Sequence, residues 1–376
     1  MVYDVIVLGL GGMGTATVDV LAGRGLRVLG LEQYALGHHR GGSHGRTRII
    51  RQAYFESPGY LPLLRRAYAL WDTFPPAYAI NRVGCLMLGR ADSPVLVGAG
   101  RSAAEWGIAV ETLTGPEIAT RFPQFTPASD DVALFEPGAG FVRPEETLAF
   151  LSSRSKERGA ELRPGERVLG WDVVAGGVEV RTSEGRYAAG RLVLAAGAWT
   201  PVIAPTLALP IRVEQRVMHF FAPRGDPAEF APERMPTFLW DLGVGDSIYG
   251  FPLDGPEGVK VAFHDRGPVI DPDQPRPAVP PAEVEAIRQI LRERLPHLPG
   301  RLIRSVPCLY DLTPDHHFAL GLAPGLDDRV VVGAGFSGHG FKFVPVIGEI
   351  LADLATDGTS DFDLDFLSLT RFADPS

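Results

Sequence analysis

The chain has 376 residues, 45% of them hydrophobic, and a formal net charge of −9 at pH 7. That length is enough for two domains with full cores, and the net acidity argues against a nucleic-acid-binding surface spread over the whole protein. Two cysteines, Cys85 and Cys308, are too few for a disulfide framework.

The hydrophobic pattern argues against a membrane protein. No segment reaches the roughly 18 continuous apolar residues that a transmembrane helix requires. The first residues, MVYDVIVLGLGGMG, carry no basic n-region of a signal peptide and lead directly into a glycine-rich turn. We therefore expect a cytoplasmic protein with neither a membrane nor a nucleic acid as its partner.

The first predicted elements form a strand–helix–strand unit. DVIVL, residues 4–8, is a short β-branched run that suits a buried parallel strand. TATVDVLAGRG then predicts a helix that ends at Gly23 or Gly25, and LRVLGLE predicts a second strand that ends at Glu32. About thirty residues in this order are typical of one βαβ unit.

The turn between the first strand and the helix has the dinucleotide-binding pattern. Gly9, Gly11 and Gly14 match G-x-G-x-x-G, which permits a tight turn, close approach of a pyrophosphate to the backbone, and close packing of helix on strand. The phosphates would then face the free N–H groups of the helix N-terminus. Glu32, at the end of the second strand, is placed to bind ribose hydroxyls.

The middle of the chain changes character twice. Residues 55–80 have apolar positions at helical spacing, whereas residues 83–140 contain short segments with many Gly and Pro and no clear βα alternation. An α/β pattern returns over 143–200, where a helix is followed by a strand, a hairpin and a strand.

The second half is first strand-rich and then α/β. Residues 211–265 predict strands, 281–295 predict an amphipathic helix, and 329–355 predict a strand, a glycine-rich turn (GAGFSGHGF) and a helix. A nicotinamide-binding domain is usually continuous in sequence. The distributed α/β pattern and the second glycine turn, which contains Gly338, therefore favour FAD over NAD.

Six motifs in order along nearly the whole chain resemble the monomeric sarcosine oxidase family, which includes N-methyltryptophan oxidase and pipecolate oxidase. They are DVIVLGLGGMG, GSHGRTRIIRQAY, LAAGAW, KVAFHD, CLYDLTPDHHF and GFSGHGFKF. The resemblance implies a two-domain flavoenzyme of the D-amino-acid-oxidase type. It also implies oxidation of N-methyl or cyclic secondary amino acids, with electrons passed to oxygen.

The expected fold is therefore α/β plus β, with a Rossmann-type FAD-binding domain that is discontinuous in sequence and a smaller sheet-rich substrate domain. We assign residues 1–82, 141–210 and 305–376 to the FAD-binding domain. Residues 83–140 and 211–304 are assigned to the substrate domain.

Cys308 lies in the CLYDLTPDHHF motif. From burial statistics alone it would be an inert core cysteine. The resemblance instead implies that its sulfur is joined to the 8α carbon of the flavin, so that FAD is covalently attached through Cys308.

The segment RGGSHGRTRIIR carries four arginines between Arg40 and Arg51. A solvated basic loop or a nucleic-acid contact would explain the charge, but neither explains Ile49 and Ile50 between Arg48 and Arg51. Buried guanidinium groups need anionic partners, and a flavin or a substrate carboxylate supplies one.

The resemblance assigns roles to the remaining site residues. It implies that His44 and Arg48 lie beside the flavin ring, that Arg51 and Lys342 bind the substrate carboxylate, and that Tyr249 and His264 line the pocket. His264 as an ordinary core histidine remains an alternative.

The segment RQAYFESPGYLP departs from the loop expected in sarcosine-specific members, so we expect Phe55, Glu56 and Tyr60 to reshape the entrance. Met218 and His219 are also unfamiliar near the pocket.

Lys260 is one of only three lysines, beside Lys156 and Lys342. A strand lysine normally extends its ammonium to water. A chain that uses arginine at nearly every basic position suggests a specific need for this lysine, because an ammonium is a compact point charge. The resemblance implies that Lys260 activates oxygen.

The sequence therefore predicts a flavin-dependent oxidase that converts sarcosine, O₂ and water to glycine, formaldehyde and H₂O₂. Alternatives are an oxidase of N-methyltryptophan, pipecolate or proline-like rings, a flavin dehydrogenase, and a flavin-binding subunit of a larger assembly. We expect a monomer without a metal, since neither HExxH nor CxxC occurs and the paired histidines are adjacent in sequence.

Overall fold

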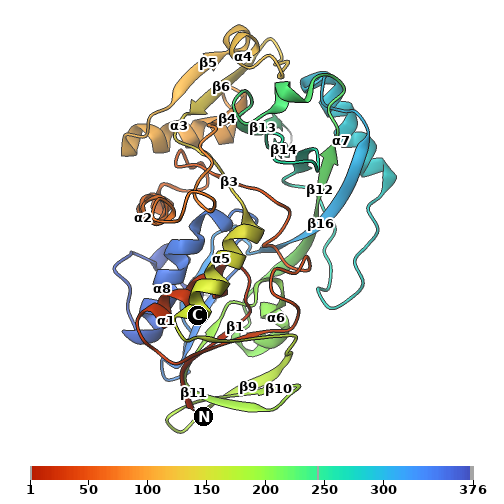
Figure 1. The fold of residues 1–376 in the computed structure, drawn as a ribbon. Coiled ribbons are helices and arrows are strands. Elements are labelled where there is room, and N and C mark those ends of the chain that lie inside the picture. Colours follow the sequence, from red (N-terminus) through yellow and green to blue (C-terminus); the bar gives the residue numbers. More distant parts are fainter. Residues whose placement is uncertain (1, 244, 373–376) are drawn as a thin grey trace.

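The computed structural model describes residues 2–243 and 245–372, and two eight-stranded sheets form its framework (Figure 1). The first sheet has the order β17-β18-β11-β1-β2-β8, and the antiparallel strands β10 and β9 extend from β11. Its strands are β1 (Val2–Leu8), β2 (Val28–Glu32), β8 (Glu161–Pro164), β9 (Val168–Val174), β10 (Gly177–Thr182), β11 (Arg186–Leu194), β17 (Ala319–Leu322) and β18 (Val330–Ala334).

The predicted βαβ unit is confirmed. β1 runs parallel to β2 on one side and to β11 on the other, and α1 (Gly12–Gly23) connects β1 to β2. Every residue of β2 is buried, as expected of a parallel strand covered on both faces. This is the Rossmann-type arrangement that the sequence predicts.

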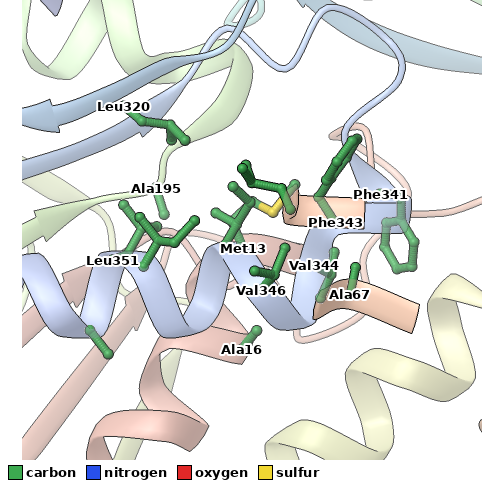
Figure 2. Close-up of a cluster of buried hydrophobic side chains, with 14 of the residues drawn as sticks. Met13, Ala16, Ala67, Ala195, Leu320, Phe341, Phe343, Val344, Val346 and Leu351 are labelled. Atoms are coloured by element: carbon green, nitrogen blue, oxygen red, sulfur yellow. The ribbon is translucent and has the colours of Figure 1, made fainter. Parts of the chain in front are cut away.

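Helices that are far apart in sequence pack together against the first sheet. α1 contacts α5 (Pro144–Glu157) and α8 (Val344–Thr356), and α8 also contacts α2 (Leu61–Trp71). Figure 2 shows Met13 and Ala16 of α1 facing Val344, Val346 and Leu351 of α8. A Cβ on Gly348 would lie 2.7 Å from the Ala16 Cβ, so this glycine sets how closely the two helices approach.

The second sheet has the order β16-β12-β15-β14-β13-β4-β6-β5. It is mostly antiparallel, and α7 (Pro281–Arg294) packs its buried residues Ile287 and Leu291 in the same core cluster as this sheet's apolar side chains. The strands are β4 (Cys85–Arg90), β5 (Glu111–Thr114), β6 (Asp131–Glu136), β12 (Arg212–Phe221), β13 (Thr237–Gly243), β14 (Asp246–Gly250), β15 (Val259–Phe263) and β16 (Leu302–Leu312).

A short two-stranded sheet and the long strand β16 link the two large sheets. β3 (Arg48–Ile50) pairs with β7 (Gly140–Val142) in a separate two-stranded sheet. β16 pairs with β12 from Leu302 to Leu312, and its Leu309 N–H donates to the Gly41 carbonyl in the loop before β3. The proposed domain change at residue 305 thus lies within one strand of the second sheet.

Residues 83–140 are more regular than the sequence suggested. They contain α3 (Pro94–Trp106) and α4 (Gly115–Arg121) between the strands β4, β5 and β6. The two glycines of α3 hid the helical pattern, but Gly98 has a packing reason: a Cβ there would lie 2.9 Å from the Phe55 backbone. The short helix α6 (Thr200–Ile203) completes the α-helices of the described residues.

Candidate functional site

The larger cavity lies where β1 and β2 end. Its wall contains four residues predicted from the sequence to bind the cofactor, namely Gly9, Gly11, Glu32 and Gly338. Other parts of the wall come from far along the chain: Ser43, Arg48, Glu166, Arg167, Val168, Ala195, Ala196, Gly197, Ala198, Trp199, Leu309, Tyr310, Asp311, Phe336, Gly340 and Phe341.

The three glycines of the motif have different structural roles. Gly9 has φ of +92°, and a Cβ there would lie 2.5 Å from the Ala195 carbonyl oxygen. A Cβ on Gly14 would lie 1.8 Å from the Gly9 carbonyl oxygen, so Gly14 lets α1 pack on the turn. Gly11 lines the cavity, where a Cβ would meet only the Ser43 hydroxyl, at 3.4 Å. These positions match the roles expected of the motif.

Glu32 is buried and already fixed by backbone donors. Its Oε2 accepts a hydrogen bond from the Leu10 N–H and its Oε1 accepts one from the Tyr34 N–H, each at 3.0 Å. His38 approaches Oε1 at 3.3 Å. Because a carboxylate has about four acceptor sites, Glu32 keeps capacity for hydroxyl groups in the cavity.

A smaller cavity adjoins the first, and the two share Arg48, Tyr310, Gly338 and Phe341 in their walls. Five residues predicted to act in catalysis or substrate binding line it. The structure brings together Arg48 and Arg51 beside β3, Tyr249 of β14, His264 after β15, and Lys342 before α8.

Arg51 has an internal partner that the sequence analysis did not assign to it. Its Nη2 lies 2.9 and 3.0 Å from the two carboxylate oxygens of Glu56, and its Nη1 donates to the Ala53 carbonyl at 2.7 Å. The guanidinium is buried and lies 4.7 Å from the centroids of the Tyr54 and Phe55 rings. Although burial alone would raise it, the pKa of Glu56 is lowered to about 2, mainly by Arg51.

Lys342 is the second buried cation of the smaller cavity. Its Nζ donates to the His339 carbonyl at 2.8 Å. Burial lowers the pKa of Lys342 to about 7, against the opposing attraction of Glu56. A bound anion would stabilise the charged form of this lysine.

Three other polar side chains of the smaller cavity, Tyr249, His264 and His339, are held neutral. Burial raises the pKa of Tyr249 and lowers the pKa of His264. Burial also lowers the pKa of His339 to about 3, and its Nε2 lies 2.9 Å from the His316 carbonyl while its Nδ1 contacts the Tyr54 hydroxyl. His339 therefore donates from Nε2 and accepts at Nδ1.

Four predicted residues are not among the described residues that line either cavity: Gly14, His44, Lys260 and Cys308. His44 is fully buried, and neither ring nitrogen has a hydrogen-bond partner within residues 2–243 and 245–372. Burial, followed by the nearby Arg48, lowers the pKa of His44 to about 2. An orphaned, neutral imidazole beside the cavity calls for a group that the chain itself does not supply.

Lys260 lies behind the loop that precedes β3. Its Nζ donates to the Gly45 carbonyl at 2.8 Å and to the Thr47 carbonyl, and it lies 4.0 Å from the centre of the Phe251 ring. Burial, followed by the repulsion of Arg48, lowers the pKa of Lys260 well below its usual value. The side chain points inward rather than to water, against the expectation for an ordinary strand lysine.

Cys308 lies between residues of the cavity wall. The Arg48 Nη2 is 3.5 Å from its Sγ, and the Gly42 carbonyl oxygen is 3.9 Å away. Its neighbours in sequence, Leu309 and Tyr310, line the larger cavity. The thiol is buried and free, and the Arg48 guanidinium lies beside it.

These features fit a dinucleotide flavin. The larger cavity provides a glycine turn at a helix N-terminus and a buried acid at the end of β2, and Gly11 leaves space where a Cβ would project. The orphaned His44 supplies an independent sign of a missing partner. Across the described residues, no group of three or more His, Cys, Asp and Glu side chains is arranged to hold a metal ion.

Sequence reasoning missed part of the smaller cavity and placed some residues too near it. Phe55 and Glu56 line it, but Tyr60 is buried among aromatic rings, including His317 and Phe318. Met218 contacts Arg48 at 3.9 Å, whereas His219 faces Ser305 and Glu283. Ile49, Leu239, Phe251, His339 and Phe341 also line the cavity but were not predicted. Ile49, His339 and Phe341 lie within the motifs that carry the resemblance, whereas Leu239 and Phe251 lie outside all six.

No helix within the described ranges, 2–243 and 245–372, is both long and apolar enough to cross a membrane.

Comparison with known proteins gives consistent results. The model of the family "FAD dependent oxidoreductase" matches residues 4–354. Monomeric sarcosine oxidase of Streptomyces avermitilis is 44% identical over 99% of this chain and 98% of that protein. N-methyl-L-tryptophan oxidase of Salmonella dublin is 36% identical over 99% of this chain and 100% of that one. The structure of NikD, described as an unusual amino acid oxidase essential for nikkomycin biosynthesis, superposes with a TM-score of 0.82 at 28% identity, covering 97% of each chain.

Proposed function

This chain belongs to the FAD-dependent oxidoreductases, in the family of monomeric sarcosine oxidase and N-methyl-L-tryptophan oxidase, and from that premise we propose that it oxidises an N-methyl amino acid at the smaller cavity. Sarcosine is the first candidate, with glycine, formaldehyde and H₂O₂ as products. The alternatives are N-methyltryptophan and cyclic secondary amino acids such as pipecolate or proline.

One observation carries the proposal: a pocket with two buried cations, Arg51 and Lys342, adjoins the cavity that fits FAD. A planar guanidinium binds a carboxylate through two parallel hydrogen bonds, and a buried ammonium adds a second charge contact. A carboxylate bound there would fix an amino acid beside the shared wall residues Arg48, Tyr310, Gly338 and Phe341.

We propose that the larger cavity holds FAD through the Gly9–Gly14 turn, Glu32 and Gly338, with covalent attachment at Cys308. When bound, FAD supplies the redox chemistry: it accepts two electrons from the substrate and passes them to oxygen. The protein supplies orientation, charge and exclusion of water. Because Arg48 lines both cavities, it is placed to contact both the cofactor and the substrate.

The Glu56 carboxylate has to move away from Arg51 before a substrate carboxylate can bind this guanidinium. In the structure both of its oxygens contact the Arg51 Nη2, while Nη1 donates to the Ala53 carbonyl, so the substrate carboxylate replaces an internal carboxylate rather than water. Binding therefore exchanges one buried ion pair for another, and the net gain is smaller than the strength of either pair. The released Glu56 remains available to a cationic part of the substrate.

Tyr249 and His264 are suited to positioning the substrate rather than to transferring a proton. Both are buried, and the pKa of each is shifted towards the neutral form by burial. Neutral groups let the amine nitrogen keep a free electron pair, which oxidation of the adjacent carbon requires. Phe55, Leu239 and Phe251 supply apolar wall for an N-methyl group or a ring.

A peroxide assay across sarcosine, N-methyltryptophan, pipecolate and proline tests the proposal. We expect O₂-dependent H₂O₂ formation, with the highest kcat/KM for sarcosine. Flavin reduction without peroxide, followed by reoxidation with an artificial quinone acceptor, would instead identify a dehydrogenase. Gel filtration of the protein produced alone tests the expected monomer, and activity only after addition of a partner chain would identify a subunit of a larger assembly.

A further inference from the structure

The loop between β15 and α7 crosses from the second sheet to the wall of the cofactor cavity. We call residues 265–280 the strap. Figure 1 shows this long connection extending beside β12 and β16 before the chain returns to α7. It contains five prolines, at positions 268, 272, 275, 277 and 280. Proline restricts the free chain, so the strap loses little entropy when it is ordered.

The first half of the strap is tied to β12. The Arg216 Nε donates to the His264 carbonyl at 2.8 Å, just before the strap begins. The Gln215 N–H donates to the Pro268 carbonyl at 3.0 Å, and the Ile270 N–H donates to the Val213 carbonyl at 2.9 Å. These backbone bonds fix the strap alongside β12, where Glu214 and Val269 form an isolated antiparallel bridge.

The apolar side of the strap reaches the cavity wall through Ile270. Ile270 packs in a small cluster with Ala198, Trp199, Val213 and Leu309. Three of these, Ala198, Trp199 and Leu309, line the larger cavity. The strap therefore backs residues that would contact the cofactor, although it belongs to a connection of the other sheet.

Asp273 joins the strap to the same wall by polar contacts. Its Oδ1 accepts a hydrogen bond from the Trp199 indole N–H at 2.9 Å, and its Oδ2 lies 2.7 Å from the Arg167 Nη2. Arg167 is half exposed, so that ion pair contributes little by itself. Trp199 is only 9% exposed, so its indole N–H loses its partner if Asp273 is removed.

Arg276 reaches the opposite part of the wall. One of its guanidinium nitrogens donates to the Arg40 carbonyl, directly before the wall residues Gly41 and Gly42. Its Nη1 is buried without a hydrogen-bond partner in the part of the chain that the structure describes.

We propose that the strap supports the wall of the cofactor cavity: its contacts through Asp273 and Arg276 restrain Trp199 and the segment before Gly41, and so slow the departure of FAD. This inference rests on the proposed binding of FAD in the larger cavity. It assigns a retention role to residues outside the glycine motifs and outside the predicted attachment site.

The test uses Cys308→Ser protein, in which FAD cannot be attached through this sulfur and remains exchangeable. Release of bound FAD after dilution is followed by the rise in fluorescence of free FAD. Removal of the Trp199 and Arg167 contacts by Asp273→Ala should accelerate release about tenfold. Arg276→Met, which removes the contact to Arg40 and the buried orphan nitrogen, should accelerate release as well.

Asp172→Ala is the matched control, because Asp172 pairs with Arg181 at 3.4 Å on the β9–β10 hairpin of the first sheet. Its release rate should stay within about twofold of the parent, as expected for an exposed ion pair. Hydrogen exchange supplies a readout independent of flavin release: FAD should slow exchange of the Ile270 N–H in the parent and less so in Asp273→Ala.

Equal release rates for the parent, Asp273→Ala and Arg276→Met would overturn the strap proposal while leaving FAD binding intact. A parent protein that takes up no FAD would overturn the proposed function and the strap proposal with it. Unfolding midpoints of the FAD-free variants separate a local effect from loss of the fold. If Asp273→Ala does not fold, Arg276→Met alone decides.

Discussion

The two adjoining cavities are built in opposite ways. The larger one is formed mainly by backbone, glycines and apolar side chains, with Glu32 held by two backbone N–H groups. The smaller one places three charged side chains, Arg51, Glu56 and Lys342, among apolar ones; Arg51 lowers the pKa of Glu56 against the effect of burial, and burial lowers the pKa of Lys342. The first is shaped before its ligand arrives, whereas the second holds an internal ion pair that a ligand has to replace.

This difference decides what the sequence could predict. Gly9, Gly11, Gly14 and Glu32 lie within one βαβ unit, where short-range rules relate residue type to backbone geometry. The FAD-binding fold follows from such local patterns and was predicted correctly. The helix α3 (Pro94–Trp106) was missed because its glycines serve a packing contact with Phe55 that only the folded chain reveals.

The smaller cavity depends on contacts between distant segments. The resemblance pointed to Arg51 and Lys342 but could not give the ion pair with Glu56, because pairing depends on how the loop before η1 (Pro58–Tyr60) folds back. Lys260 and His44 also lie behind the wall instead of in it. Which buried side chain faces which cavity is set by packing, and no spacing rule in the sequence encodes it.

The largest expected effect tests the cofactor side. Replacing Cys308 by Ser should abolish covalent attachment of flavin, because no thiol then remains beside Arg48. After acid denaturation, flavin should stay with the wild-type chain and appear in the supernatant of the variant. Cys85→Ser is the control: burial raises the pKa of Cys85 to about 11, so this thiol stays protonated and unreactive. Free flavin from acid-treated wild type would refute the attachment.

Lys260 tests whether a residue behind the wall acts on the chemistry of the larger cavity. Lys260→Met should slow reoxidation of reduced flavin by oxygen about 10²-fold or more, because a fixed positive charge stabilises an anion as it forms. Reduction by substrate should change much less. Stopped-flow measurement of the two half-reactions separates these effects, with Lys156→Met in α5 as the control.

A structural role for Lys260 predicts a different outcome. The ammonium holds the Gly45 and Thr47 carbonyls, and its loss would loosen that loop. Wild-type reoxidation combined with a lower unfolding midpoint would therefore mean that Lys260 only supports the loop before β3.

The next effect belongs to the smaller cavity. Arg51→Ala should raise KM for sarcosine about 100-fold, since a bidentate, charge-assisted contact to the carboxylate is lost. The change also leaves Glu56 buried without its partner, which could alter the pocket by itself. The double variant Arg51→Ala/Glu56→Gln removes that complication and should show the same rise. Unchanged binding of a simple carboxylate inhibitor to either variant would contradict the assigned role.

Lys342 should make carboxylate binding depend on pH. Its pKa in the free protein is lowered to about 7, and a bound carboxylate favours the charged form and raises that pKa. Affinity should therefore be constant below pH 7 and fall by up to about tenfold per pH unit above it, until the pKa of the complex is reached. Titration of flavin absorbance with acetate measures this, and Lys342→Met should show a flatter profile.

The smallest and most diagnostic effect concerns Glu56, the residue that makes the two cavities different. If its carboxylate competes with the substrate for Arg51, Glu56→Gln should lower Kd for acetate about three- to tenfold at pH 6, where Lys342 is charged. Glu56 also supports the charge on Lys342, so its removal should lower the pKa of that lysine further. The gain in affinity should consequently shrink, or reverse, by pH 8.

Weaker acetate binding at both pH values would mean that Glu56 organises Arg51 for its ligand instead of competing with it. Comparing acetate with sarcosine then resolves the remaining role: a carboxylate that also holds the substrate amine would improve acetate binding but weaken sarcosine binding when it is neutralised.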